Sequence, residues 1–408
     1  MKHYLWYNAQ DSYFYENDHD YFSGFAINAH TLAHNAKAFL ALQFTTGKPF
    51  FILPDIHAIQ FYSPQLFDNK KGGTRISWEK LRRFYPNVVT RTLSERRSLS
   101  PNDFSEQGLL DFARGILDFQ RRALDEPFRS LSRLVPGAEV PRPEFLVAPY
   151  FFFQNARDPW LPLAAGVSAS AASLKGRDKV FGVIACSSSC LDLPELSVID
   201  SSFTRLPLDG FLIWIDDFDE TDASEDALSG LIELVRRLSS TGKPVINMYG
   251  GYFSILLKYF GLEGFGSGIC TRDSMSVHPQ IQGGGPAGGP IPRYYIPKLH
   301  KKLVQEDARR LIGQVPALTC RCEICANRSL LTMASVTSDQ RSNLRQLMRE
   351  HFLRVRFDQV TRVDSESPQL ALNDLTAASA EIVGAPSALF DSTFLGRWSR
   401  ALSHNLLG

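Results

Sequence analysis

The sequence has little of what a disulfide scaffold, a membrane protein or a strongly basic nucleic-acid-binding protein needs. Its 408 residues include only six cysteines, which are too few for a disulfide framework. No run approaches the roughly 18 consecutive apolar residues of a membrane-spanning helix, and the mean hydropathy is −0.14. The 44 basic and 43 acidic residues leave a net charge of +1. Any surface that binds nucleic acid therefore has to be a local basic patch.

The N-terminal residues also lack the basic start, apolar core and small-residue cleavage site of a signal peptide. We therefore expect a cytoplasmic location. Hydrophobic residues make up 44% of the chain and charged residues 21%, a composition typical of a soluble globular protein. The length allows one large domain or two ordinary ones.

Several short apolar runs are typical of buried strands, because each ends at polar or turn residues. Helical patterns lie between them, for example at residues 104–123 and 224–238. Such alternation indicates a parallel sheet covered on both faces, which is either a (β/α)8 TIM barrel or a doubly wound sheet. No GxGxxG motif follows the first predicted strand, so we favour the α/β barrel. The predicted strands are residues 49–53, 144–153, 179–186, 210–215, 244–248 and 264–270.

Polar residues follow these strands, and active sites of such barrels lie at the carboxyl ends of the strands. We expect the side chains there to face one pocket. Gln154, Asp216 and Tyr249 are the candidates for binding substrate. Asp55, Asp217 and Asp273 are the candidate catalytic acids. Each acid also has a structural interpretation, as a turn cap, a helix cap or the partner of a neighbouring arginine.

Three cysteines crowd into six positions, as Cys320-Arg-Cys322-Glu-Ile-Cys325, and His351 follows on a predicted helix. In a cytoplasmic protein such crowding indicates a metal site before a disulfide. Three thiolates and one imidazole make a complete tetrahedral set for Zn²⁺. A set of four protein ligands predicts a structural zinc ion, since a catalytic zinc keeps an open position.

The spacing of these residues, C-x-C-x₂-C followed by 25 residues and a histidine, resembles the zinc signature of the tRNA-guanine transglycosylase family. That family has a TIM barrel with a zinc subdomain near the end of the barrel. The resemblance implies that Cys320, Cys322, Cys325 and His351 are zinc ligands. It also implies a barrel domain over residues 1–297, with a zinc subdomain and C-terminal helices over residues 298–408.

Other segments resemble the family less closely. Residues 51–61 are similar to its LTDSGGFQ strand, which implies that Asp55 contacts the target base. Residues 181–186 and 210–220 are similar to two further strands, although Ala185 replaces a base-binding glutamine. The strand with the family's nucleophilic aspartate is similar to residues 264–272, but Ser267 stands in the aspartate's place. The chain therefore resembles a divergent member, with similarity to the branch that inserts 7-deazaguanines into DNA.

The resemblance implies a base exchange at C1′ that retains configuration, which needs a covalent nucleophile and an acid/base group. Asp55 is the expected acid/base or base-reading residue, and Asp217 or Asp273 the expected nucleophile. The expected reaction replaces guanine with a 7-deazaguanine such as preQ0, in DNA in preference to tRNA. The alternatives are a catalytically inactive homologue, which Ser267 favours, and a hydrolase that only removes the base.

Two basic stretches offer a local surface for phosphates. One is a predicted helix at residues 298–310, and the other is the predicted helix that carries His351. If zinc joins the two helices, they form one basic face. Between the barrel and these helices, the Gly/Pro-rich residues 282–292 form a loop that is either a lid or a linker. Members of the family often dimerise, so the resemblance implies a homodimer. The basic residues concerned are Lys298, Lys301, Lys302, Arg309, Arg310, Arg341, Arg345, Arg349, Arg354 and Arg356.

Overall fold

The computed structural model describes residues 1–69, 73–131, 136–269, 273–278, 293–326, 338–382 and 391–407. Its main sheet is parallel throughout, with the strand order β3-β2-β1-β9-β8-β7-β6-β4, and β5 pairs with β6 beyond β4. The strands are β1 (Lys2–Trp6), β2 (Gly24–Asn28), β3 (Phe50–Leu53), β4 (Leu146–Val147), β5 (Phe152–Phe153), β6 (Val180–Cys186), β7 (Gly210–Ile215), β8 (Val245–Asn247) and β9 (Gly264–Ser267).

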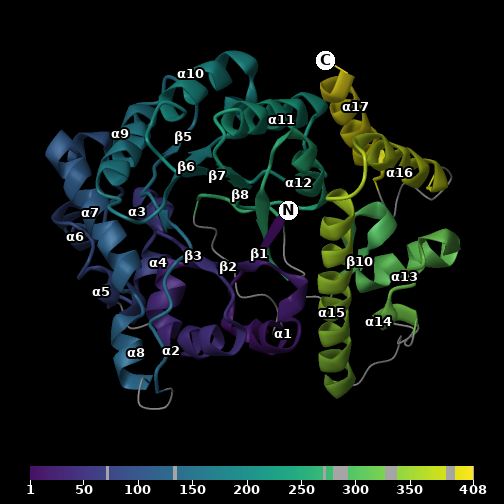
Figure 1. Cartoon of the computed structure of the whole chain (residues 1–408), viewed down its shortest axis with the longest axis horizontal. Helices are drawn as coiled ribbons and strands as arrows, with labels where there is room; N and C mark the ends of the chain where they lie inside the picture. Colours follow the sequence, from purple (N-terminus) through teal and green to yellow (C-terminus); the bar gives the residue numbers. More distant parts are fainter. Residues whose placement is uncertain are drawn as a thin grey trace.

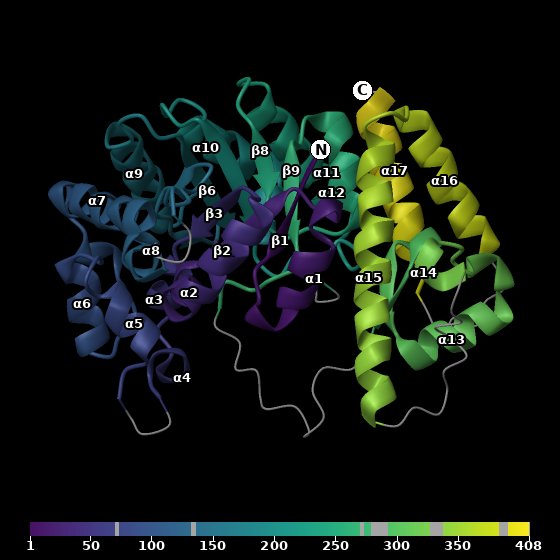
Figure 2. The same ribbon diagram turned by 60° about the horizontal axis from the view of Figure 1, so that its bottom comes forward.

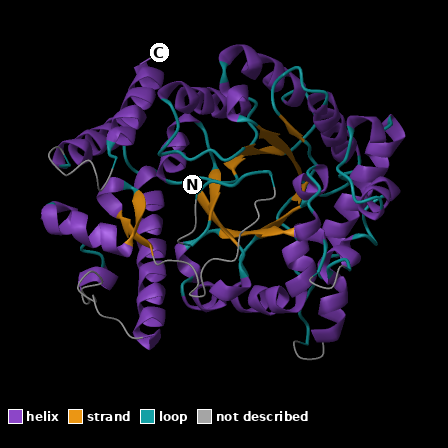
Figure 3. Cartoon of the chain, turned by 180° about the vertical axis from the view of Figure 1, so that it is seen from behind, coloured by secondary structure: helices purple, strands orange, loops and turns teal. Residues whose placement is uncertain are grey.

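The two outer strands of this order meet and close the sheet into a barrel. The backbone N–H of Glu144, just before β4, donates to the carbonyl of Phe50 in β3 over 2.8 Å. Figure 3 shows the strands as a ring with the helices outside it. The predicted α/β TIM barrel is confirmed. The larger helices that surround the ring are α2 (Ala29–Thr46), α7 (Glu106–Arg122), α9 (Trp160–Ser173), α10 (Leu193–Phe203) and α11 (Glu225–Ser239) (Figure 1).

Shorter helices lie in the connections. After β3 come α3 (Ile56–Gln60), α4 (Pro64–Phe67), α5 (Ile76–Leu81) and α6 (Asn87–Ser94), and α8 (Asp125–Leu131) follows α7. The N-terminal helix α1 (Ser12–Asn17) stands between β1 and β2, and α12 (Tyr252–Leu256) follows β8. In the part of the chain that the structure describes, no helix is both long and apolar enough to cross a membrane.

The glycines of β9 make room for the barrel's interior side chains. A Cβ at Gly266 would lie 2.4 Å from the carbonyl oxygen of Met248 and 3.0 Å from Nε1 of Trp6. That Nε1 donates to the same carbonyl over 2.8 Å. Trp6 therefore reaches across β9 to β8 only because residue 266 has no side chain. Glycine lowers strand propensity in general, but here it permits an interstrand hydrogen bond.

The strand predictions were incomplete at the N-terminus and wrong in one detail. Strands β1 and β2 were not predicted, although β1 lies between β2 and β9. The single strand predicted at residues 144–153 is two short strands, β4 and β5, both paired with β6. Tyr150, in the interruption, turns its hydroxyl to the His57 ring instead of continuing the ladder.

The C-terminal part packs beside the barrel (Figure 2). It contains the antiparallel hairpin β10 (Arg293–Ile296) and β11 (Lys301–Val304). The helix predicted at residues 298–310 is therefore wrong in its first half. His300, with φ of 52°, ends a 3₁₀ turn, and the helix begins only at Gln305. The helices are α13 (Gln305–Gln314), α14 (Glu323–Ala326), α15 (Ser338–Val363), α16 (Pro368–Glu381) and α17 (Thr393–Leu407).

The predicted domain division at residue 297 falls within the β10–β11 hairpin, and the division stays a prediction. Helix α17 returns to the barrel and packs on α11. Its buried Trp398 donates from Nε1 to the carbonyl of Glu220 over 2.8 Å. The predicted loop at residues 282–292 lies outside the described residues.

Candidate functional site: a Cys3His cluster and the carboxyl-end mouth of the barrel

The four predicted metal ligands come together between α14 and α15. One ligand atom from each of Cys320, Cys322, Cys325 and His351 lies within 4.8 Å of the other three. Nδ1 of His351 is 3.2 Å from Sγ of Cys322 and 3.5 Å from Sγ of Cys325. The predicted convergence of these four residues is confirmed. We refer to them as the Cys3His cluster.

Hydrogen bonds around His351 orient its ring for a metal. Nε2 lies 2.7 Å from the carbonyl oxygen of Tyr295, and a carbonyl can only accept, so Nε2 carries the hydrogen. Nδ1 therefore presents its lone pair toward the thiols. The ring also stacks on Tyr294, with centroids 4.7 Å apart, and the Tyr294 hydroxyl lies 3.3 Å from Sγ of Cys325. Partners of this kind fix the tautomer and orientation of histidine ligands.

The donor set fits a zinc-like ion. Zn–S bonds near 2.3 Å and Zn–N bonds near 2.0 Å, in a tetrahedron, place ligand atoms roughly 3.5–4 Å apart, which agrees with the compact group seen here. Three thiolates with one imidazole favour zinc over magnesium or calcium, which prefer oxygen ligands. The Cys3His cluster can therefore hold a metal ion. The zinc identity and its structural role stay predictions.

Asp55 and His30 form a dyad at the ends of β3 and β2. Oδ2 of Asp55 accepts hydrogen bonds from the backbone N–H of His30 over 2.7 Å and from the ring Nδ1 over 2.8 Å. The Asp55 side chain is 1% exposed, whereas that of His30 is 43% exposed. The histidine therefore lies between the buried carboxylate and solvent.

The charges of the dyad reinforce each other. Burial acts to lower the pKa of His30, but the adjacent Asp55 carboxylate outweighs burial and raises that pKa. Burial acts to raise the pKa of Asp55, and the charge and hydrogen bonds of His30 outweigh it, so that pKa is lowered. Nearby, burial lowers the pKa of His57 to about 4 in spite of Asp55. His57 is therefore neutral at physiological pH, and the shifts of Asp55 and His30 both favour the charged forms of the dyad.

Several buried polar atoms around the dyad have no partner among the described residues. They are Oδ1 of Asp55, Oδ1 of Asn28 and the hydroxyl of Tyr85. Buried polar atoms are usually hydrogen-bonded to protein, water or a ligand. This end of β2 and β3 therefore has unused hydrogen-bonding capacity beside a charged dyad.

Aromatic rings line the mouth next to the dyad. Trp6 and Tyr249 stack with centroids 4.8 Å apart and an interplanar angle of 8°, and both are partly exposed. Trp214 lies 5.1 Å from Tyr249 and 4.8 Å from the His57 ring. Burial raises the pKa of Tyr249, and the Asp55 charge adds to that rise. The predicted site residues Asp55 and Tyr249 thus belong to one neighbourhood.

The carboxyl end of β7 holds the other predicted acids. Oδ1 of Asp216 accepts from Ser276 Oγ over 3.0 Å and from Val277 N–H over 2.7 Å. Asp217 has φ of 46° and donates its N–H to the carbonyl of Met275 over 3.1 Å. Asp216 and Asp217 line a pocket of about 600 Å³, together with Ser188, Phe218, Asp219, Thr221, Asp222, Ala223, Ser224, Ala227, Arg293 and Lys301.

Asp273, Gln154 and Ser267 lie apart from the dyad. Asp273 forms an ion pair with Lys302 over 2.8 Å, in the boundary between barrel and C-terminal part. Gln154 is exposed at the rim, and its carbonyl accepts from Ser189 Oγ over 2.8 Å. Ser267 is buried and lies 2.8 Å from Nε2 of His3. None of these contacts tests the catalytic or binding roles, which stay predictions.

Most described members of the predicted basic face are buried or paired with acidic residues, and its role as a phosphate-binding surface stays a prediction. Arg356 is fully buried, and the Lys302 side chain is only 7% exposed. Arg349 pairs with Asp11 over 2.8 Å, and Lys298 pairs with Glu381 over 3.0 Å. Arg354 pairs with Glu323, and Arg309 and Arg310 pair with Glu306. The side chain of Arg341 lies outside the described residues.

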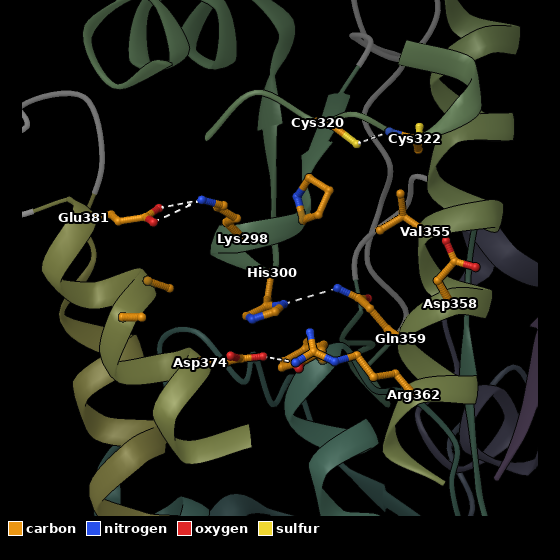
Figure 4. Close-up of a pocket in the computed structure, with 14 residues that line it drawn as sticks. Lys298, His300, Cys320, Cys322, Val355, Asp358, Gln359, Arg362, Asp374 and Glu381 are labelled. Atoms are coloured by element: carbon orange, nitrogen blue, oxygen red, sulfur yellow. Dashed lines mark hydrogen bonds and ion pairs between the residues drawn. The ribbon is translucent and has the colours of Figure 1, made fainter. Parts of the chain in front are cut away.

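A second pocket, of about 550 Å³, lies beside Cys320 and Cys322, between α15 and α16 (Figure 4). Figure 4 shows charged side chains of its wall bonded to one another, with Lys298 to Glu381 and Arg362 to Asp374. Nε2 of Gln359 is 3.2 Å from Nδ1 of His300, whose ring stacks on Tyr252. The polar groups of this pocket are largely satisfied by each other.

The reasoning from sequence missed His30, His57 and the aromatic rings Trp6 and Trp214. His30 is the second residue of α2, directly after β2. Had residues 25–27 been recognised as a buried strand, His30 would have stood at a strand end with the other candidates. His57 follows Asp55 by two positions, and its place just after a predicted strand could have identified it as a candidate site residue.

Comparisons with known proteins do not assign the chain to a family. No family model matches the sequence, and no curated protein matches it. Similar solved structures include xylanases. A psychrophilic glycoside hydrolase family 10 endo-beta-1,4-xylanase has 10% identity and a TM-score of 0.37, covering 66% of this chain and 86% of that one. An endo-1,4-beta-xylanase from Caldicellulosiruptor owensensis has 8% identity and a TM-score of 0.37, covering 68% and 89%. This likeness gives no information about reaction or ligand.

Proposed function

We propose that this protein is a base-exchange transglycosylase that replaces guanine in a nucleic acid with a 7-deazaguanine such as preQ0. The proposed site is the carboxyl-end mouth of the barrel. The Asp55–His30 dyad is the observation that carries the proposal, because it places a charged acid/base pair at a strand end beside unpartnered polar atoms. The spacing of the Cys3His cluster, which resembles that of the transglycosylase family, supports it.

The dyad has the chemistry that a departing or arriving base requires. The Asp55 carboxylate fixes the His30 ring through Nδ1, which leaves Nε2, 3.3 Å from the Thr31 hydroxyl, as the proton-transfer atom. In the protonated form it gives its proton to the leaving guanine. In the neutral form it then takes a proton from the incoming 7-deazaguanine. Because Asp55 raises the pKa of His30, the proton is held for the first of these steps.

The covalent step is assigned to Asp217. Its carboxylate is exposed at the end of β7, and no ion pair of it is recorded among the described residues. Asp273, the other predicted nucleophile, has its carboxylate held by Lys302. In the proposed step, a carboxylate oxygen of Asp217 bonds to C1′ as the bond from C1′ to the guanine nitrogen breaks. The incoming base then displaces Asp217, and the two displacements retain configuration.

Stacking at the mouth supports a planar substrate. Trp6 and Tyr249 stack on each other and are partly exposed, so a base that has left its helical stack would pack on an outer face of this pair, as bases do on aromatic side chains. The orphan acceptors on Asp55 and Asn28 match the ring N–H and amino donors of a guanine-like base. DNA is the preferred polymer only on the basis of the resemblance.

A catalytically inactive transglycosylase-like subunit, which binds or scaffolds nucleic acid, is the second candidate. It is favoured by Ser267, which stands in the nucleophile's place and is bonded to His3 inside the barrel. In that case the Cys3His cluster and the barrel would serve only to bind or scaffold nucleic acid.

An exchange assay tests the proposal. Metal-loaded protein is incubated with preQ0 or labelled guanine and with host tRNA or double-stranded DNA, and the polymer is digested to nucleosides for mass analysis. Incorporation that is lost in Asp55→Asn and Asp217→Asn, but kept in Asp178→Asn at the other end of the barrel, supports the proposal. No incorporation into either polymer overturns it in favour of the inactive subunit. Release of free guanine without an incoming base indicates a hydrolase.

A further inference from the structure

Residues 273–278, which lie between β9 and β10 in the sequence and which we call the mouth segment, contact the carboxyl end of β7. The carbonyl of Met275 accepts from Nε1 of Trp214 over 2.8 Å and from the N–H of Asp217 over 3.1 Å. Val277 is fully buried, and its N–H donates to Asp216. The backbone of the mouth segment therefore sets the position of the strand end that carries Asp216 and Asp217.

The first residue of the mouth segment is held by the C-terminal part of the protein. Oδ1 of Asp273 lies 2.8 Å from Nζ of Lys302, and Oδ2 lies 4.0 Å from Nη2 of Arg356. The Arg356 side chain is 0% exposed and that of Lys302 is 7% exposed. The Asp273 carboxylate itself is 26% exposed, but its removal would leave the charges of two buried cations uncompensated.

Arg356 depends on this contact more than a surface arginine would. Nε, Nη1 and Nη2 have no hydrogen-bond acceptor within the described ranges. The guanidinium packs over the rings of Phe265, Tyr295 and Phe352 at 5.1–6.0 Å, where cation–π attraction gives partial compensation. Asp273 is the one carboxylate recorded within 4.0 Å of it in the described structure.

The same two cations are built into the framework of the Cys3His cluster. His351 and Arg356 lie on α15, about one and a half turns apart. Nε2 of His351 donates to the carbonyl of Tyr295, whose ring lies under Arg356 at 5.1 Å. Tyr295 in β10 pairs directly with Lys302 in β11. A shift of α15 relative to β10 would therefore move both cations relative to Asp273.

We propose that Lys302 and Arg356 are positioning residues that hold the mouth segment through Asp273, so that metal in the Cys3His cluster stabilises the β7 end of the barrel mouth. The ion does not touch the mouth. It fixes α15 to the cysteine loop, and α15 with β11 presents the two cations. Without the ion, the thiols and His351 lose their common partner, α15 becomes freer to shift, and the mouth segment opens locally. Only the consequence for Asp217 as nucleophile rests on the proposed function.

Hydrogen exchange followed by mass spectrometry tests this in the full chain without any substrate. In the metal-loaded protein, Asp273→Asn and Lys302→Met are expected to raise exchange at least tenfold in peptides containing the amides of Asp217 and Val277. Lys298→Met is the matched control, because Lys298 pairs with Glu381 on the same part of the protein and has no contact with the mouth segment in the described structure. Removal of the metal from the unmodified protein is expected to raise exchange in the same peptides.

The metal content of each variant is measured alongside, so that loss of the ion is not mistaken for loss of the ion pair. Unchanged exchange in metal-loaded Asp273→Asn would overturn the proposal even if Lys302→Met does not fold. The proposal would also be overturned if metal removal raised hydrogen exchange in α15 but left exchange in the mouth segment unchanged. A failed base-exchange assay with positive exchange data would remove the proposed function and leave this coupling intact.

Discussion

Oδ2 of Asp55 receives both the backbone N–H of His30, over 2.7 Å, and the ring Nδ1 of the same residue, over 2.8 Å. His30 is the second residue of α2, and the side chain of Asn28, the residue before the helix, makes no capping hydrogen bond. A carboxylate just after β3 therefore caps a helix that starts after β2. The negative charge also lies where the helix dipole favours it. One oxygen atom thus stabilises a helix and orients a histidine.

The dyad predicts a particular dependence of stability on pH. The lowered pKa of Asp55 contributes stability above the unfolded value near 3.9, which is lost as pH falls through the folded pKa. The raised pKa of His30 contributes stability below the unfolded value near 6.5, which is lost as pH rises through the folded pKa. Asp55→Asn should therefore cost most between about pH 4 and 6.5, with a loss of about 2 kcal/mol.

Urea unfolding at acidic, mildly acidic and alkaline pH measures this difference. His19→Gln is the control, since His19 pairs only loosely, at 3.8 Å, with an Asp20 that is largely exposed. A cost of Asp55→Asn that does not vary with pH would argue against the ion pair.

The Cys3His cluster predicts one tightly held metal ion per chain. Cys322→Ser and His351→Ala should each reduce the bound metal and lower the melting temperature. Apparent binding free energies at structural zinc sites are on the order of 10 kcal/mol or more, and binding supports folding. Elemental analysis with thermal unfolding, before and after a chelator, makes the measurement. Cys190→Ser should leave the metal content unchanged, since Cys190 is buried in the 3₁₀ turn after β6 and donates to the carbonyl of Gln154. Full metal content in His351→Ala would contradict the site.

Glu220 predicts a second effect of pH, of opposite sign to that of Asp55. Burial raises its pKa from 4.5 to about 7, although Ser254 and the N–H of Phe253 donate to it. The folded state thus binds a proton that the unfolded state releases. Its stability contribution is complete below about pH 4.5 and is lost as pH rises to about 7, a change of about 3 kcal/mol.

In Glu220→Gln this loss should disappear, so the free energy of unfolding should fall less between pH 5 and pH 8 than in the unmodified protein. Glu225→Gln is the control, because Glu225 is partly exposed and pairs with Arg400 at the surface. An unchanged pH slope in Glu220→Gln would show that another group is responsible.

Two helical glycines predict opposite effects of the same substitution. A Cβ at Gly230, in α11, would lie 2.2 Å from the carbonyl oxygen of Leu191. A Cβ at Gly313, in α13, meets nothing within 4 Å. Gly313→Ala should therefore stabilise the protein by about 0.5–1 kcal/mol through helix propensity. Gly230→Ala should destabilise it by more than that, because backbone has to shift. Equal shifts in denaturation midpoint would refute the packing argument.

The barrel was predictable from sequence in strands made of longer apolar runs, such as β6 and β7, whereas the short apolar run of β2 was missed. Strand β1 was also missed, because it begins with Lys2 and His3. Lys2 is satisfied by Glu144, and His3 by Ser267. These partners are distant in the sequence, so the residues around Lys2 and His3 do not predict a barrel strand.

The candidate sites show the same division. The Cys3His cluster could be predicted because three of its ligands are close neighbours and their spacing is specific. The basic face could not be judged from sequence, since whether Arg356 is solvated or buried depends on the docking of α15 against the barrel. His30 also escaped prediction, because its partner Asp55 is 25 residues away and the strand before it was not recognised.

The place of β1 between β2 and β9 has a consequence for synthesis of the chain. His3 in β1 and Ser267 in β9 are hydrogen-bonded to each other, although they are 264 positions apart in the sequence. At roughly 5–20 residues per second, a ribosome needs on the order of tens of seconds to make β9 after β1 has emerged. For that time the nascent β1–β2 pair has an open hydrogen-bonding edge next to buried aromatic residues, a feature that invites aggregation. Slower translation would lengthen this exposure and lower the yield of closed barrel. A chaperone that covers the open edge of β1 would raise it.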